Sequence, residues 1–288
     1  MYQTVLEALQ QLADSGVNFG VENSRKGERE FQNALGGKLQ ELTRMDEWSW
    51  RYHARKEERF KTQALTNTSS IAVDLVGRHQ ECGAVAIELK YVAIKPNGVA
   101  PQDAYAFPWD VAKDCLKLDL LRAGRCEPAK GGSALPDPSK LQTYCIGMTS
   151  WPVFWEGREK FAWATNFLAQ IQPSVARFEG LIHTIGPSEK TVSYHKRHHI
   201  SFGRVWTGEW RDYTKGFRYI FLRPETNSVP AWTHHKDRSI DEQSQIIPFL
   251  NVGARQEWER RYSLEKANAG IAERERSSSS EHPQSGAV

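Results

Sequence analysis

Two segments near the start of the chain carry apolar residues at helical spacing. In the first these residues are Val5, Leu9 and Leu12, and in the second, which begins near Ser24, they run from Phe31 to Leu42. A single apolar stripe with polar residues around it is typical of a helix that packs one face on a core. We therefore expect a short first helix, a loop and a longer second helix.

The pattern then changes to the alternation that is typical of strands. Residues 48–52 alternate, and two aliphatic runs follow, Ser70–Val76 and Ala84–Val92. The polar segment GRHQECG, from Gly77 to Gly83, separates the two runs. Runs of this kind on either side of a glycine-bounded polar segment predict a β-hairpin with a long loop.

The rest of the chain mixes both patterns. We expect helices over Trp109–Ala123, Arg158–Ile171 and Arg255–Lys266, and strands over Leu141–Thr149 and Gly216–Leu222. This order of elements predicts an α/β fold with a mixed central sheet.

The same pattern divides the chain into three parts. We expect an N-terminal helix and loop over residues 1–23 and a main domain over residues 24–265, with a C-terminal β-rich extension from about residue 175. Residues 266–288 are expected to be a disordered tail, because their end, SSSSEHPQSGAV, cannot bury enough apolar surface to fold.

Composition restricts the class of protein more than its function. The 288 residues include 38 Lys and Arg against 35 Asp and Glu, a net charge of +3 that is too small to indicate nucleic acid by itself. There is no apolar run long enough for a membrane span, and the N-terminus lacks the basic start and apolar core of a signal peptide. The four cysteines form no CxxC pair and are expected to be free thiols. We therefore expect a cytoplasmic protein without membrane contact.

Charged residues interrupt the two aliphatic runs. Because side chains on a strand alternate between its faces, Asp74 lies opposite its aliphatic neighbours, and Glu88 and Lys90 lie together opposite theirs. The aliphatic positions are Ile71, Val73 and Leu75 in the first run, and Val85, Ile87, Leu89 and Tyr91 in the second. If both aliphatic rows face the same core, Asp74, Glu88 and Lys90 converge on the opposite face.

Such a convergence suits phosphodiester hydrolysis. Two neighbouring carboxylates repel each other, so one of them takes up a proton unless a cation lies between them. Mg²⁺ or Mn²⁺ is the expected cofactor, since these ions bind carboxylate oxygens and keep other positions for water and phosphate. The lysine can then orient or deprotonate an attacking water, or neutralise charge on the phosphate. Ordinary charges on an exposed strand face would also produce this pattern.

The charged positions belong to a longer series of segments. Along the chain, the segments come in this order: KGEREFQNAL (residues 26–35), VD ending at Asp74, IELK ending at Lys90, FPWDVAKDCLKLDLLRAG (residues 107–124) and QTYCIGMTS (residues 142–150). In this order, the segments resemble the core of the PD-(D/E)xK nuclease superfamily. Val73 stands where that family often has proline.

The resemblance implies a fold, a cofactor and a set of site residues. The implied fold is a restriction-endonuclease-like mixed sheet flanked by helices, and the implied activity is a metal-dependent nuclease, with a DNA endonuclease as the main expectation. Asp74, Glu88 and Lys90 would be catalytic. Glu28, Asp74, Glu88 and the carbonyl of Leu89 would hold the metal, with Glu30 as a second match for the helical acid.

Several alternatives remain open. The same fold could serve as a catalytically inactive nucleic-acid-binding or assembly subunit, although the intact set of charges argues against this. RNA could replace DNA, and the protein could act as a homodimer or within a larger complex. Further contacts with nucleic acid are expected from Lys113, Lys117, Lys196, Arg197 and Arg204, but ordinary surface charge explains these positions about as well.

Overall fold

The computed structural model describes residues 1–21, 23–53, 57–62, 70–95, 97–98, 107–130, 137–156, 175–178, 181–183, 199–214 and 216–226. Its helices are α1 (Tyr2–Asp14), α2 (Ser24–Leu42), α3 (Phe107–Arg122) and α4 (Val153–Glu156), with 3₁₀ turns η1 (Arg44–Asp46) and η3 (Pro138–Lys140). Among these residues, no helix is both long enough and apolar enough to cross a membrane.

The strands form one large sheet and two small ones. The large sheet has seven strands in the order β1 (Ser49–Arg51), β4 (Leu75–His79), β5 (Gly83–Val92), β7 (Leu141–Thr149), β12 (Arg218–Pro224), β11 (Trp206–Asp212) and β8 (Val175–Phe178). β2 (Glu58–Thr62) lies between β3 (Ser70–Val73) and β6 (Cys126–Pro128), and β9 (Leu181–His183) pairs with β10 (His199–Ser201).

The large sheet is mixed, because β5 and β7 are parallel whereas its other neighbouring strands are antiparallel. This confirms the expected α/β class with a mixed central sheet. The late strands β8, β11 and β12 extend this sheet beyond β7.

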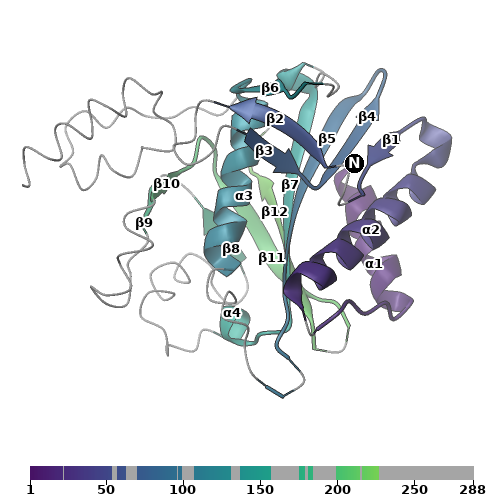
Figure 1. The fold of residues 1–288 in the computed structure, drawn as a ribbon, viewed down its shortest axis with the longest axis vertical. Helices are drawn as coiled ribbons and strands as arrows, with labels where there is room; N and C mark the ends of the chain where they lie inside the picture. Colours follow the sequence, from purple (N-terminus) through teal and green to yellow (C-terminus); the bar gives the residue numbers. More distant parts are fainter. Residues whose placement is uncertain are drawn as a thin grey trace, which may run out of the picture.

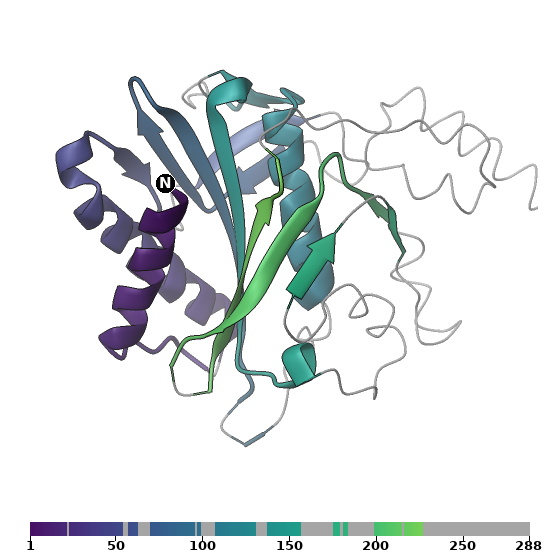
Figure 2. The same ribbon diagram turned by 180° about the vertical axis from the view of Figure 1, so that it is seen from behind.

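Helices cover both faces of the sheet, as Figures 1 and 2 show. α1 and α2 pack on one face and α3 packs on the other. Strand β5 supplies side chains to both layers by alternation: Val85, Ile87, Leu89 and Tyr91 join the core beneath α1 and α2, whereas Ala84, Ala86 and Val92 join the core beneath α3. Glu88 and Lys90 have the parity of the α3 layer, as the alternation of the sequence predicts.

Local signals explain where the main helices begin and end. Asn23 caps α2, its side-chain oxygen accepting a hydrogen bond from the Lys26 N–H at 3.1 Å. α3 ends just before Gly124, which has a φ of 65° that other residues rarely adopt. The expected helices over residues 24–42 and 109–123 and the strand Leu141–Thr149 are confirmed.

The predicted hairpin is wrong in its first arm. The chain breaks at Asp74, so that Ser70–Val73 pairs with β2 in the small sheet and a new strand begins at Leu75. Ile71 and Val73 therefore pack in the α3 layer, whereas Leu75 packs beneath α1 and α2. Aspartate is unfavourable within a strand, and this one marks the point where the chain changes sheets.

The expected long hairpin loop is also mostly strand. β4 runs through Gly77 to His79 because it pairs with β1, where Trp50 lies opposite Gly77. A Cβ on Gly77 would lie 2.9 Å from the Trp50 ring, so this glycine makes room for an aromatic side chain. The turn itself is confined to residues 80–82.

The late strand starts two residues later than expected, at Arg218, because Gly216 lies in the preceding turn with a φ of 79°. The predicted helices Arg158–Ile171 and Arg255–Lys266 and the predicted tail lie outside the described residues.

Candidate active site

The candidate site begins where β4 leaves the edge of β5. The pairing of the two strands ends at Leu75 and Ile87, and beyond it the Leu89 N–H donates to Asp74 Oδ2 at 2.7 Å. Gln32 of α2 donates to the Asp74 carbonyl at 2.7 Å and so anchors the break between β3 and β4. Since the N–H and C=O of a strand residue point to the same side, the Leu89 carbonyl faces the same edge as Asp74.

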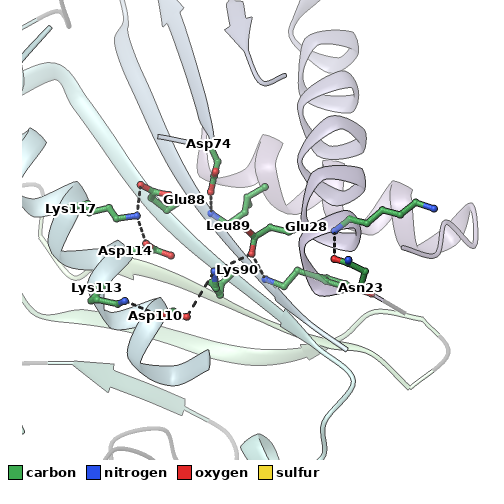
Figure 3. A network of polar contacts seen from close by, with 12 residues as sticks. Asn23, Glu28, Asp74, Glu88, Leu89, Lys90, Asp110, Lys113, Asp114 and Lys117 are labelled. Carbon is green, nitrogen blue, oxygen red and sulfur yellow. Dashed lines mark hydrogen bonds and ion pairs between the residues drawn. The ribbon is translucent and has the colours of Figure 1, made fainter. Parts of the chain in front are cut away.

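Helix α2 brings a second carboxylate to the same edge. The Tyr91 N–H donates to Glu28 Oε2 at 3.2 Å, and Figure 3 shows Glu28 beside Lys90. The neighbouring Gly27 allows this approach, because a Cβ at that position would lie 2.2 Å from the Tyr91 ring. Carboxylates of Asp74 and Glu28 thus occupy the backbone donors of β5 that a neighbouring strand would otherwise use.

Lys90 projects between α2 and α3. Its Nζ lies 3.3 Å from Glu28 Oε2 and 4.0 Å from Asp110 Oδ2 of α3. Asp110 also pairs with Lys113 at 2.7 Å. The side chain of Lys90 is 25% exposed, so its ammonium group is held by two carboxylates and still reaches solvent.

Glu88 pairs with Lys117 of α3 and not with Lys90. Its side chain is 3% exposed, and its Oε1 lies 3.5 Å from Lys117 Nζ of α3. Lys117 also pairs with Asp114, one turn earlier on the same helix, at 2.6 Å. Figure 3 shows the carboxylates and lysines of β5 and α3 facing each other.

The buried carboxyl groups favour their protonated forms. Burial raises the pKa of Asp74 to about 7, against the opposing effect of the Leu89 N–H. Burial also raises the pKa of Glu88, against the opposing charge of Lys117, and the nearby Asp74 carboxyl group raises it further. The pKa of Glu28 is raised by burial and lowered in part by Lys90. The carboxyl groups of Asp74 and Glu88 therefore hold their protons more readily than exposed carboxyl groups do.

For Lys90 and Lys117, the charges of neighbouring carboxylates have a larger effect on the pKa than burial has. Burial alone would lower the pKa of Lys90, but Glu28, Asp114 and Asp110 outweigh it, so the pKa is raised. Likewise, Asp114 and Glu88 outweigh the effect of burial on Lys117, whose pKa is raised. Both lysines remain charged at neutral pH.

The structure brings together most of the residues expected from the sequence. Three groups of contacts lie along residues 88–91 of β5: Asp74 with Leu89, Glu88 with Lys117, and Lys90 with Glu28, Asp110 and, through Asp110, Lys113. Lys196 and Arg197 lie outside the described residues. Glu30, the second match for the helical acid, instead accepts a hydrogen bond from the Gly20 N–H at 2.7 Å.

The expected phosphate contact by Arg204 is wrong. This residue is 6% exposed and its Nε lies 2.8 Å from Asp119 Oδ1. Its Nη2 donates to Thr143 at 2.9 Å. A guanidinium group held inside the core by these partners stabilises the fold and does not face a nucleic acid.

Asp110 and Asp114 were not assigned to the site from the sequence. With Lys117 they stand at positions i, i+4 and i+7 of α3, which places all three on one face of the helix. That spacing is visible in the sequence, but only the packing of α3 against β5 turns this face toward Glu88 and Lys90.

Known proteins give no independent guide to this site. Comparisons with protein-family models, curated proteins and solved structures find no match. Across the part of the chain that the structure describes, no group of three or more His, Cys, Asp or Glu side chains is arranged to hold a metal ion.

Proposed function

We propose that this protein is a metal-dependent nuclease of the PD-(D/E)xK type, with a restriction-endonuclease-like arrangement of its core and DNA as substrate. One observation carries the proposal: Asp74 and Glu28 each accept a hydrogen bond from the backbone of β5 within three residues of Glu88, and Lys90 pairs with Glu28. The three carboxylates come from separate segments of the chain, so their closeness in the structure does not follow from closeness in the sequence.

The chemistry of the donor set, three carboxylates and a backbone carbonyl, suits a hard divalent cation, although the described side chains do not surround a single ion position. The Asp74 and Glu88 carboxyl groups influence each other's pKa, and Glu88 Oε1 is buried without a hydrogen bond among the described residues. Mg²⁺ and Mn²⁺ prefer such carboxylate and carbonyl oxygens. Asp74, Glu88, Glu28 and the Leu89 carbonyl would hold the ion. A bound divalent cation would supply Lewis acidity for the phosphodiester and for water.

The side chains of the site can perform the remaining tasks. The partly exposed ammonium of Lys90 can donate to a phosphate oxygen or orient a water, and Glu28 at 3.3 Å fixes its direction. Because the pKa of Lys90 is raised, the residue is suited to stabilising developing negative charge as a permanent cation. This favours a charge-stabilising role over one as a general base.

A second candidate is a nucleic-acid-binding protein that does not cleave. It is favoured by the lysines themselves, since Lys117 and Lys90 already lie 3.5 Å and 3.3 Å from acidic oxygens that a metal would need. In such a protein the charges would stabilise the fold or contact phosphate without catalysis.

Cleavage assays on the full chain separate the two candidates. Supercoiled, linear and single-stranded DNA and RNA are incubated with wild type, Glu88→Gln and Glu209→Gln in Mg²⁺, Mn²⁺, Ca²⁺ or EDTA. Glu209 is a matched control because it is an exposed glutamate on another strand of the same sheet. The nuclease is supported by Mg²⁺- or Mn²⁺-dependent cleavage that Glu88→Gln loses and Glu209→Gln keeps.

We expect Ca²⁺ to support cleavage poorly, since it takes more ligands at longer distances than Mg²⁺. Full cleavage in EDTA, or equal cleavage by Glu88→Gln and wild type, would contradict the metal-dependent mechanism. Binding of nucleic acid with no cleavage under any condition would favour the second candidate.

A further inference from the structure

Lys117 occupies a position in the site that its place in the sequence does not suggest. The lysine of the ExK segment, Lys90, forms its ion pairs with Glu28 and Asp110. It is Lys117, from the neighbouring helix, that lies 3.5 Å from Glu88, the more deeply buried glutamate of the site. The positive charge beside the Asp74–Glu88 pair therefore comes from α3.

A divalent cation and this ammonium group would compete for the same buried negative charge of Glu88. Mg²⁺ binds a carboxylate oxygen at about 2 Å, so an ion on Glu88 Oε1 would face Lys117 across a few ångströms. Like charges at such separations repel strongly in a partly buried site, where water screens them little. We therefore expect the binding of either one to weaken the binding of the other.

We propose that Lys117 and a divalent cation compete for the Asp74–Glu88 pair, with Lys117 as its counter-ion in the metal-free protein and released from Glu88 when metal binds. The proposal rests on the proposed function, since it requires that the site take up a metal. It makes Lys117 a residue that sets the affinity of the site for metal.

Asp114 would remain as an ion-pair partner for Lys117 after its release from Glu88. It holds Lys117 Nζ at 2.6 Å, and its own side chain is 9% exposed, so this ion pair can remain when the contact with Glu88 is lost. The Lys117 side chain is 29% exposed and has a long flexible stem. Rotation about Asp114 would leave its ammonium group at the rim of the site, where a bound phosphodiester would meet it.

The first test measures how readily each lysine amine of the wild-type protein reacts with an acylating reagent, with and without Mn²⁺, by mass spectrometry. Lys38 is an internal control, because it also pairs with a carboxylate at 2.6 Å and its side chain is 23% exposed, but it lies on α2 beside Glu41. We expect Mn²⁺ to increase labelling of Lys117 several-fold and to leave Lys38 unchanged.

The second test measures Mn²⁺ affinity by calorimetry for wild type, Lys117→Met and Lys113→Met. Lys113→Met removes the same charge one turn away, where the partner is Asp110. At about pH 8.5, where proton competition is reduced, we expect Lys117→Met to bind Mn²⁺ about ten-fold more tightly than wild type and Lys113→Met to change affinity by less than about two-fold.

The outcomes distinguish this inference from the proposed function. If Mn²⁺ binds and Asp74→Asn abolishes binding, but labelling of Lys117 stays equal or falls and Lys117→Met does not bind more tightly, then the competition is overturned and the metal site stands. If wild type binds no Mn²⁺, the metal-dependent function and the competition are both overturned.

Discussion

Helix α3 carries two groups of charged residues, and they differ in how completely their polar atoms are satisfied. In the first group Asp119 and Arg204 are both buried and pair at 2.8 Å. The Gly203 N–H donates to the second Asp119 oxygen at 3.1 Å, and Thr143 accepts from the guanidinium at 2.9 Å. Arg204 also lies over the Trp206 ring, 5.4 Å from its centroid.

The second group, which involves the α3 residues from Asp110 to Lys117, is organised differently. Lys117 lies 3.5 Å from Glu88, and Lys90 lies 4.0 Å from Asp110. Glu88 Oε1 is buried without a hydrogen bond among the described residues, and the pKa of Asp74 is raised by burial to about 7. These contacts are longer and leave acidic oxygens available.

The difference separates a structural ion pair from a candidate functional one. A buried pair whose two carboxylate oxygens both accept hydrogen bonds has little left to offer a ligand. Crowded carboxyl groups with raised pKa values in a partly open site cost stability and are frequent where a protein binds or reacts. Both groups contain an aspartate of α3, so sequence composition alone does not distinguish them.

Removing an acid from the second group should have the largest effect on activity and little on folding. We expect Glu88→Gln to lower DNA cleavage in Mg²⁺ by on the order of 10³ or more, since it removes a metal-binding charge at nearly constant volume. Circular dichroism and thermal melting should show a folded protein. A folded variant that cuts at the wild-type rate would remove Glu88 from the site.

Removing Arg204 from the first group should instead have its largest effect on folding stability. We expect Arg204→Met to lower the free energy of unfolding by about 3–5 kcal/mol, because it leaves Asp119 buried without its charge partner. Arg218→Met is the matched control, since Arg218 pairs with Asp212 at 2.6 Å in an exposed position. Loss of that exposed pair should cost less than about 1 kcal/mol in urea unfolding. Equal losses in the two variants would show that burial does not distinguish the pairs.

Lys90 should affect catalysis more than binding. Lys90→Ala is expected to lose on the order of 10²–10³ in cleavage rate, because its charge acts mainly in the transition state, and to lose little DNA affinity. Lys90→Arg should not restore cleavage, since a planar guanidinium is bulkier and differs in geometry beside Glu28. DNA affinity in Ca²⁺ and cleavage in Mg²⁺ are measured for each protein. A loss of affinity as large as the loss of rate would make Lys90 a binding residue.

The sequence predicts the elements near this site better than it predicts their connections. Alternation along Ala84–Val92 correctly puts Glu88 and Lys90 on one face, because both sides of β5 are covered and the parity of the strand decides each residue's layer. The break at Asp74 could not be predicted, since it depends on the pairing of Ser70–Val73 with β2 in the small sheet, which no local pattern indicates.

Long-range packing also decides which charges belong to the site. Arg204 and Lys117 each stand among apolar neighbours in the sequence, and each was expected to contact phosphate. The structure buries Arg204 against Asp119 and turns Lys117 toward Glu88. Neither partner lies close by in the sequence, so no local pattern could separate a core arginine from a lysine of the candidate site.

The smallest expected effect is a pH dependence of stability that arises at Asp74. Its pKa is about 7 in the folded protein and about 3.9 in an unfolded chain, so the folded state holds the proton more tightly. Stability from this group is therefore complete below about pH 4 and is lost as the pH rises to about 7. The raised pKa of Glu88 acts in the same direction. The metal-free protein should thus be less stable in mildly basic than in mildly acidic solution.

Asp74→Asn tests this directly, because it keeps the volume and removes the titration. Between about pH 5 and pH 8 in EDTA, we expect wild type to lose on the order of 1–2 kcal/mol more stability than Asp74→Asn, a value discounted because Asp74 is partly exposed. The exposed Asp46 of η1 provides the control variant Asp46→Asn, which should follow wild type. Urea unfolding at each pH gives the free energies. Parallel curves for wild type and Asp74→Asn would show that the Asp74 carboxyl group is already well solvated, and the contrast between the two groups of charges on α3 would then rest on hydrogen bonding alone.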